Sequence, residues 1–162
     1  SHIYAIGDCI GGIQLAHVAS REGIIAVEHM AGLKPTLFTE RQVPRCIYSN
    51  PEVASIGFTE QEAKKQGFSI KVGKIPFKAI GKALVNGNSD GFIKMIADEK
   101  TDDLLGVHLI GNQVTELISE ASLATLLDAT PWEIAETIHP HPTLSEAFAE
   151  VSLAVDGKAI HG

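Results

Sequence analysis

The chain has 162 residues, 44% of them apolar, and a net charge of −7, which allows one medium-sized domain with a core, or one domain plus part of another. The negative charge argues against nucleic acid as a partner, no apolar run is long enough to span a bilayer, and no signal or transit peptide is visible. Cys9 and Cys46 are far apart and form no Cys-X-X-Cys pattern, which argues against a disulfide scaffold or a zinc knuckle. We expect both to be small buried or half-buried side chains.

The first 32 residues have the pattern of an α/β unit. Residues 3–6 form a short apolar run that predicts a strand, and Gly7-Asp8 ends it. A glycine-containing loop follows, and the apolar spacing of residues 14–30 predicts a helix. The loop therefore lies at the carboxyl end of a strand, where α/β folds bind ligands.

Residues 33–44 contain two prolines between polar residues and indicate a connector, so we place a second domain at residues 45–162. Several antiparallel strands followed by clustered helices predict an α+β fold, with an antiparallel sheet and helices packed on it. The expected strands are residues 45–49, 53–58, 69–77, 92–97 and 104–110, with a short extended piece at 83–85. The expected helices are a short one after Thr59, then residues 113–128, one beginning at Thr130, and residues 144–155.

Two of these helices have clear start signals. Thr59 is followed by Glu62 and Thr130 by Glu133, and each pair has the spacing of a capping box. Pro131 stands at the first helical position, which favours the second start further.

Two His-Pro pairs precede the last helix. Proline disfavours helical dihedrals in the residue before it, so His139 and His141 should be extended. Thr143 is then a suitable N-cap, and Glu146 completes a capping box. An imidazole held one turn from a carboxylate is a general acid/base device, with His141 and Glu146 as its candidate members.

Two other interpretations of this stretch stay open. Glu146 can be only a cap while His141 is an ordinary surface or core histidine. Alternatively, His139 and His141 share a face of an extended segment and could bind a metal, although no third ligand is obvious nearby.

The sequence His-Pro-His-Pro-Thr-Leu-Ser-Glu, at residues 139–146, resembles the C-terminal active-site motif of the dihydrolipoamide dehydrogenase family of flavoprotein disulfide reductases. The resemblance implies that His141 and Glu146 are a catalytic acid/base dyad and that the His141-Pro142 bond is cis. It also implies a homodimer in which this histidine serves the active site of the other subunit.

Two more segments support the resemblance. Tyr-Ala-Ile-Gly-Asp, at residues 4–8, is similar to the second flavin motif of these enzymes, which implies that Asp8 binds the ribityl chain of FAD. Leu15-Ala16-His17 is similar to the helix start whose backbone meets the flavin ring, so Ala16 and His17 are candidate cofactor contacts, although His17 can equally be a helix-surface residue. Residues 50–57 resemble the interface domain of the same family.

The resemblance covers nearly the whole chain but only about the final third of the family's length. It implies FAD and NAD as cofactors of a complete cytoplasmic enzyme, or a mitochondrial-matrix one in a eukaryote. Its implied partners are dihydrolipoamide and the subunit-binding domain of the acyltransferase of 2-oxo acid dehydrogenase complexes. We expect residues 1–32 to be a remnant of the FAD-binding domain and residues 45–162 to be the interface domain.

The family's glycine-rich fingerprint and redox-active cysteine pair are absent from these 162 residues. We therefore expect the isolated chain to be inactive and to bind no cofactor. The alternatives are a non-catalytic dimerisation and partner-docking module, or the equivalent domain of another disulfide reductase such as glutathione reductase.

Overall fold

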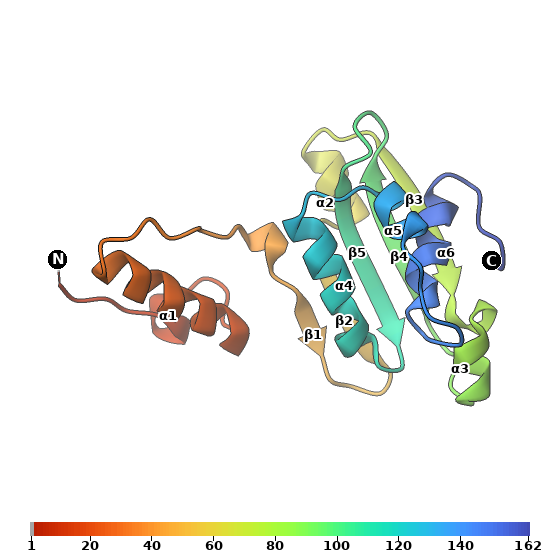
Figure 1. The fold of residues 1–162 in the computed structure, drawn as a ribbon, viewed down its shortest axis with the longest axis horizontal. Coiled ribbons are helices and arrows are strands. Elements are labelled where there is room, and N and C mark those ends of the chain that lie inside the picture. Colours follow the sequence, from red (N-terminus) through yellow and green to blue (C-terminus); the bar gives the residue numbers. More distant parts are fainter. Residues whose placement is uncertain (1) are drawn as a thin grey trace. The chain divides into compact units, whose positions relative to one another are not determined.

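The computed structural model describes residues 2–162, and the chain forms two compact units that divide between Val43 and Pro44 (Figure 1). We describe each unit by itself. No helix among the described residues is long and apolar enough to cross a membrane.

The smaller unit is built on helix α1 (Ala16–Met30), preceded by the 3-10 turn η1 (Gly7–Ile10). The helix confirms the prediction, although it begins two residues later than expected. The backbone N–H of Gly7 donates to Glu22 Oε2 at 2.7 Å, and the Tyr4 hydroxyl lies 2.7 Å from His29 Nδ1. These bonds hold the segment before the turn against α1.

The predicted strand at residues 3–6 does not form. Ile6 has extended dihedrals, but no strand among residues 2–162 pairs with this segment, and a strand needs such a neighbour to satisfy its backbone. Cys9, expected to be at least half-buried, is exposed because it lies in η1, where no residue is buried. Cys46 is half-buried, as expected, and burial raises the pKa of its thiol.

The larger unit is built on a five-stranded antiparallel sheet in the order β1-β2-β5-β4-β3. Its strands are β1 (Arg45–Ile47), β2 (Glu52–Gly57), β3 (Ile70–Pro76), β4 (Phe92–Asp98) and β5 (Leu104–Gly111). All five predicted strands are thus present. The antiparallel sheet with helices packed on it confirms the α+β prediction.

Helices α4 (Val114–Leu126) and α6 (Glu146–Val155) pack on the sheet, α4 against β2 and β5 and α6 against β3 and β4, and α5 (Pro131–Glu136) packs against α6 (Figure 1). The main core lies between these helices and the sheet. Its largest fully buried side chains include Ile93, Met95 and Val107 from the central strands and Phe148 from α6. Because side chains alternate along a strand, Ile93 and Met95 point to the same face and bury it under the helices.

A smaller cluster is formed where helix α2 (Glu60–Lys65) packs on the sheet. It contains Ala63, Ile96 and Leu105. Ile96 follows Met95 in β4, so its side chain points to the opposite face of the sheet.

The capping boxes at Thr59 and Thr130 are confirmed, with both reciprocal bonds present at each helix start. The extended piece predicted at residues 83–85 is wrong, because this segment lies in helix α3 (Gly81–Val85), which follows the 3-10 turn η3 (Phe77–Ala79). Lys, Ala and Leu are strong helix formers, and the fully buried Ala83 fixes the turn against the core.

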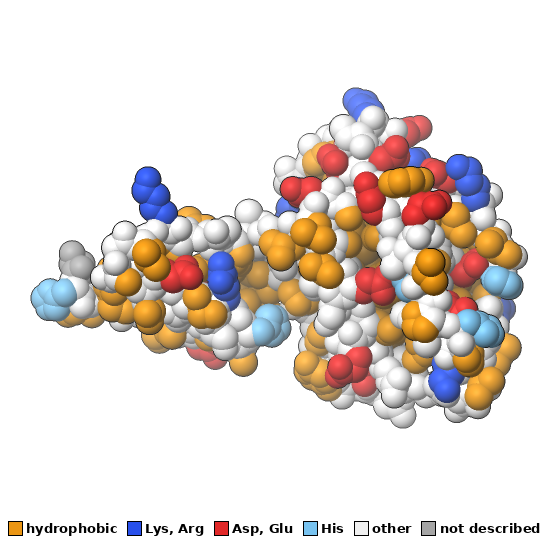
Figure 2. Space-filling model, viewed as in Figure 1, with side chains coloured by type: hydrophobic (Ala, Val, Ile, Leu, Met, Phe, Trp, Pro, Cys, Tyr) orange, Lys and Arg blue, Asp and Glu red, His pale blue; other side chains and the backbone are white. Residues whose placement is uncertain are grey.

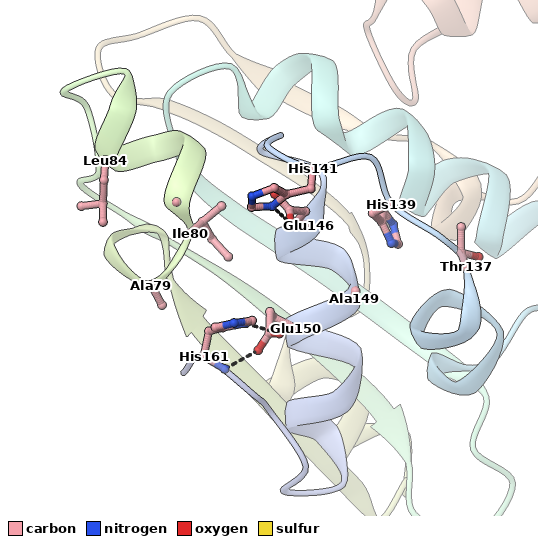
Figure 3. Close-up of a pocket in the computed structure, with 11 residues that line it drawn as sticks. Ala79, Ile80, Leu84, Thr137, His139, His141, Glu146, Ala149, Glu150 and His161 are labelled. Carbon is pink, nitrogen blue, oxygen red and sulfur yellow. Dashed lines mark hydrogen bonds and ion pairs between the residues drawn. The ribbon is translucent and has the colours of Figure 1, made fainter.

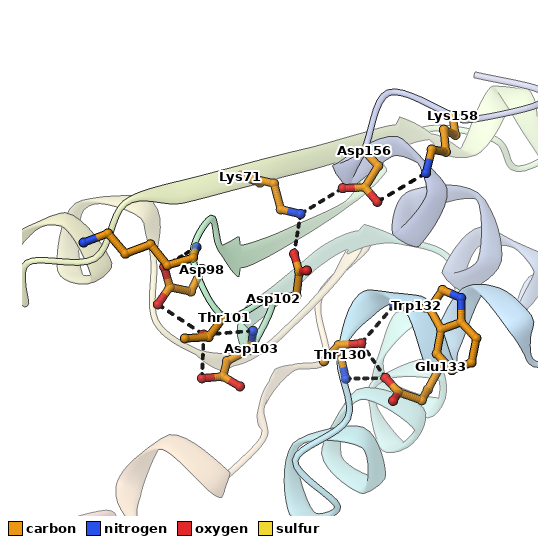
Figure 4. A network of polar contacts seen from close by, with 11 residues as sticks. Lys71, Asp98, Thr101, Asp102, Asp103, Thr130, Trp132, Glu133, Asp156 and Lys158 are labelled. Carbon is orange, nitrogen blue, oxygen red and sulfur yellow. Dashed lines mark hydrogen bonds and ion pairs between the residues drawn. The ribbon is translucent and has the colours of Figure 1, made fainter.

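A polar network joins the loop between β4 and β5 to the end of α6 (Figure 4). Lys71 on β3 donates to Asp102 in the loop and to Asp156 after α6, the latter at 2.9 Å. Both hydrogen bonds raise the pKa of the lysine, so its charge is retained over the normal pH range. Within the loop, the Thr101 hydroxyl donates to Asp103 Oδ2 at 2.8 Å.

We expect Gly73→Ala, on the face of β3 under α6, to destabilise the larger unit. A Cβ there would lie 2.7 Å from the backbone nitrogen of Val155 and closer still to the carbonyl oxygen of Val151. Overpacking of this kind costs about 1–3 kcal/mol, measurable as a fall in the free energy of unfolding in urea. Gly81→Ala is the control, because a Cβ there meets nothing within 4 Å and an alanine favours the helix. Equal stability of the two variants would contradict the close packing.

Candidate acid/base site

The segment between α5 and α6 carries the two predicted His-Pro pairs. The peptide bond between His141 and Pro142 is cis, as the resemblance implies. Thr143 is not the N-cap that the sequence predicts, because α6 has its N-cap at Ser145. The Thr143 hydroxyl donates instead to the carbonyl oxygen of Pro140 at 2.6 Å. Short polar side chains often make such local bonds to the nearby backbone.

Glu146, the first residue of α6, uses both of its carboxylate oxygens. Oε1 lies 2.8 Å from His141 Nδ1, and Oε2 accepts the backbone N–H of Thr143 at 2.9 Å. Half of the predicted capping box therefore exists, and it exists together with the imidazole contact. One carboxylate both fixes the entry of the helix and orients the histidine.

Several contacts lower the pKa of the Glu146 carboxyl. The largest is the hydrogen bond from the Thr143 backbone N–H. Partial desolvation of the carboxyl opposes it and raises the pKa. The hydrogen bond and charge of His141 and the charge of His161 lower the pKa further. The carboxylate is therefore ionised at neutral pH and can only accept hydrogen bonds. His141 Nδ1 must then carry the hydrogen, which leaves Nε2 of the neutral ring as a proton acceptor. The His141 side chain is 77% exposed, so this nitrogen is accessible to a reacting group.

This pair lies in a cavity of about 380 Å³ (Figure 3). Apolar side chains from the segment at α3 form part of its wall, among them Ile80 and Leu84. The remaining lining comes from the His-Pro segment, α6 and the last residues of the chain, and includes His139, His141, Glu146, Glu150 and His161.

His139 has a different environment from His141. Its side chain is only 6% exposed, and its Nε2 lies 2.7 Å from Glu120 Oε1 on α4. Its Nδ1 is buried without a partner among the described residues. Because His139 is packed against α4 while His141 faces Glu146, they do not meet as a ligand pair, and residues 2–162 hold no group of three His, Cys, Asp or Glu side chains fit for a metal ion.

A second histidine–carboxylate pair in the cavity was missed from the sequence. Glu150 accepts hydrogen bonds from the backbone N–H groups of Ile160 and His161, at 2.9 and 3.0 Å, and its Oε1 lies 2.9 Å from His161 Nδ1. A signal existed, because Glu146 and Glu150 are four residues apart and so share one face of a helix. The partner could not be found, because nothing local indicates where residue 161 lies.

The predicted cofactor residues all lie in the smaller unit. Asp8 is exposed in η1, and Ala16 and His17 are the exposed first two residues of α1. The Gln14 side chain joins the two elements by donating to the carbonyl oxygen of Asp8 at 3.5 Å. The start of α1 has no side-chain cap, because Leu15 is the N-cap residue. An exposed carboxylate beside an uncapped helix start fits a ligand with hydroxyl groups and an anionic ring.

We expect Glu146→Gln to lower the free energy of unfolding at pH 7 by about 1 kcal/mol, through loss of charge-assisted bonds at the start of α6. Because the pKa of this carboxyl is lowered in the folded state, its contribution is present above the ordinary carboxyl pKa and is lost as the pH falls through the folded-state value. Urea denaturation of the parent chain and of Glu146→Gln should give a smaller difference in the free energy of unfolding at pH 3 than at pH 7. The exposed loop variant Glu99→Gln should change little at either pH, and a constant Glu146→Gln difference would show that the carboxylate charge is unimportant.

The chain was compared with known proteins. Residues 43–152 match the profile of the pyridine nucleotide-disulphide oxidoreductase dimerisation domain. Dihydrolipoyl dehydrogenase of Bacillus subtilis is 69% identical over 161 residues, covering 99% of this chain and 34% of that protein. The mitochondrial dihydrolipoyl dehydrogenase of Caenorhabditis elegans is 48% identical over 160 residues, with 98% and 32% covered. The chain thus spans about one third of the length of the curated relatives it matches.

Solved structures agree with the sequence matches. LpdA of Mycobacterium tuberculosis superposes with a TM-score of 0.87 at 27% identity, covering 93% of this chain and 33% of that one. The HOCl-induced flavoprotein disulfide reductase RclA of Escherichia coli superposes with a TM-score of 0.86 at 27% identity, covering 93% and 35%. The matched profile, the relatives and the fold together show that this chain belongs to the pyridine nucleotide-disulphide oxidoreductase family and contains its dimerisation domain.

Proposed function

We propose that the chain is the C-terminal part of a dihydrolipoyl dehydrogenase, which oxidises dihydrolipoamide with FAD and NAD. In this proposal residues 45–162 supply the dimer interface and the His141–Glu146 acid/base dyad, and residues 1–32 are part of the FAD-binding domain. The observation that carries the proposal is the contact of His141 Nδ1 with the ionised Glu146, which leaves Nε2 as an accessible base. The 69% identity to the Bacillus subtilis enzyme supports the choice of substrate over that of glutathione reductase.

His141 acts in this proposal as the base for a thiol of dihydrolipoamide. Its Nε2 accepts the thiol proton, and the thiolate that remains is the nucleophilic form. Glu146 holds the ring through Nδ1 and stabilises the imidazolium that results. Apolar side chains at α3, including Ile80 and Leu84, offer a surface for the aliphatic part of such a substrate.

The smaller unit would hold the flavin. Asp8 would offer its exposed carboxylate to a ribityl hydroxyl, and the backbone at Ala16 and His17 would stabilise negative charge on the ring at the positive end of α1. FAD, when bound, supplies the two-electron redox chemistry that the side chains of this chain lack.

The larger unit is proposed to form a homodimer through its helices. Several of the exposed apolar side chains of this unit lie on and near α4 and α5, and Figure 2 shows groups of apolar side chains on its visible face. Those at α4 and α5 are Leu123, Leu126, Leu127, Trp132 and Ile138, which is 96% exposed. Large apolar side chains exposed on neighbouring helices are typical of an interaction site. The family's dimerisation domain matches this unit, which supports a second copy as the occupant.

We propose a substrate, a protein partner and a location, all of which the resemblance to this family implies. The complete enzyme would bind dihydrolipoamide and the subunit-binding domain of the acyltransferase of a 2-oxo acid dehydrogenase complex. It would work in the cytoplasm, or in the mitochondrial matrix if the source is eukaryotic, as the name of the Caenorhabditis elegans relative indicates for that protein.

A second candidate function is that of a dimerisation and partner-docking module without catalysis. The exposed apolar side chains near α4 and α5 favour it. They could bind a second copy or a partner without any bound cofactor. Lipoamide turnover of the complete enzyme distinguishes the two, because a large loss in its His141→Gln variant is expected only if this part of the chain takes part in catalysis.

The isolated chain should be colourless and lack NADH-dependent lipoamide reduction. The reason is that its sequence carries neither the glycine-rich fingerprint nor the cysteine pair. Absorbance near 450 nm and a standard turnover assay measure both properties, with the complete enzyme as the positive control. Stoichiometric yellow FAD, or measurable turnover, would show that this expectation is wrong.

The chain should form a defined dimer in solution that buries on the order of 1,200 Å² or more. Leu123→Lys on α4 should give a monomer, because it places a charge within the exposed apolar surface. Val72→Lys on β3 is the control, because β3 lies at the opposite end of the sheet from β1 and β2. Multi-angle light scattering at tens of micromolar reports the mass, and a monomeric parent chain would count against the proposal.

In the complete enzyme, His141→Gln should lower lipoamide turnover by roughly 10²–10⁴, the usual value of a general acid/base group. Reduction of an artificial one-electron acceptor by NADH should survive much better, because it needs no thiol deprotonation. Glu146→Gln should lower lipoamide turnover by a smaller factor, because the imidazole remains but is less well oriented. Activities are compared at equal folded fraction.

His139→Gln is the internal control for this series, because its ring faces Glu120 and not Glu146. An effect as large as that of His141→Gln would mean that the wrong histidine has been assigned. Full lipoamide turnover in both His141→Gln and Glu146→Gln would show that the motif only starts the helix and has no acid/base role.

A further inference from the structure

Glu150 is an unusual carboxylate, because it is 6% exposed within the apolar helix α6. It is satisfied by three hydrogen bonds from two consecutive residues near the end of the chain, the backbone N–H groups of Ile160 and His161 and the His161 ring. A buried carboxylate costs free energy unless it is paired, so this arrangement fixes the last segment against α6. It also fixes the His161 ring while leaving that side chain 67% exposed.

The His161–Glu150 pair lies one helical turn from the His141–Glu146 pair. Glu146 and Glu150 are four residues apart on α6, and all four side chains line the same cavity. Figure 3 shows the two pairs one after the other along one side of α6, with His139 on the other side. Each carboxylate meets its imidazole through Nδ1, so both rings have the same hydrogen-bonding arrangement.

We infer that His161, held in place by Glu150, is a second titratable member of this site and a positioning residue that sets the charge on the His141–Glu146 pair. The catalytic meaning of this inference rests on the proposed function, whereas the charge coupling itself does not.

The charged groups around Glu146 support the coupling. The lowered pKa of its carboxyl comes mainly from the Thr143 N–H, and the charges that contribute are those of His141 and His161. The other titratable groups that line the cavity are Glu150, which is paired with His161, and His139, which faces Glu120. The lining residues from η3 and α3 are uncharged.

The consequence for the acid/base pair follows from the sign of the charges. A protonated His161 stabilises the Glu146 carboxylate and opposes the addition of a second positive charge on His141. This influence is present only while the His161 ring carries a positive charge. Glu150 keeps the second ring at the cavity and prevents the last residues from detaching.

The coupling is tested in the 162-residue chain by following the side-chain carboxyl ¹³C signal of Glu146 with pH. His161→Gln should move the Glu146 titration midpoint upward by about 0.2–0.5 pH unit, because a nearby cation is lost. His141→Gln should move it further, because it also removes a hydrogen bond. His29→Gln, in the smaller unit, should leave it unchanged. Raising the salt concentration from 20 mM to 0.5 M should reduce the His161 effect, because it is a through-space charge effect.

A second measurement tests the role of Glu150. Glu150→Gln should abolish hydrogen-exchange protection of the Ile160 and His161 amides, while the amides of the sheet stay protected and report an intact fold. An unchanged Glu146 midpoint in His161→Gln, or retained protection in Glu150→Gln, overturns the inference. A shifted midpoint together with full lipoamide turnover in His141→Gln would refute the proposed function and leave the charge coupling standing.

Discussion

The close approach of α6 to the sheet is the constraint on which the rest of the site depends. Gly73 has no side chain, so the backbone of α6 near Val151 and Val155 can lie directly against β3. Phe148 and Val151, fully buried, then fix the rotation of the helix about its axis. Once that rotation is set, the glutamates on the same face must point into one cavity. The geometry of the candidate site is therefore a result of packing between a strand glycine and a helix backbone.

The electrostatics of the site depend on the different partners of the two Glu146 carboxylate oxygens. A carboxylate that only capped the helix would leave the imidazole free to rotate, and one that only met the imidazole would leave a backbone N–H without a partner. Because one oxygen serves each task, the position of the His141 ring is fixed relative to the helix. The bond from the Thr143 N–H also keeps the carboxyl ionised, which assigns the hydrogen of the neutral ring to Nδ1.

Features with local causes could be predicted from the sequence. The capping boxes at Thr59 and Thr130 depend on residues three apart, and the His-Pro segment carries its conformational preference in its own prolines. The features that were predicted wrongly or missed depend on contacts between residues far apart in the sequence. The segment at 3–6 lacks a neighbouring strand, and the contact between His161 and Glu150 joins residues whose proximity depends on the path of the chain after α6.

The prediction for Thr143 was wrong for a different reason, because the helix begins at Glu146 with Ser145 as its N-cap. The Thr143 hydroxyl therefore lies outside the first turn and donates to the Pro140 carbonyl. A hydroxyl can donate one hydrogen bond and accept others, so the capping pattern alone does not show which residue begins the helix. The glutamate of the predicted box was still placed correctly, because its backbone partner is the same in either arrangement.

The two edges of the sheet are poor templates for strand addition, which has consequences for solubility at high concentration. The β1 edge is only three residues long, and the β3 edge carries Lys71, Lys74 and Pro76. Lysine and proline on an edge strand, or a very short edge, oppose the pairing of strands between molecules. The chain can thus expose large apolar side chains on its helical layer without also offering strand edges that pair readily. Growth into β-linked aggregates is disfavoured even where the helical surface is left uncovered.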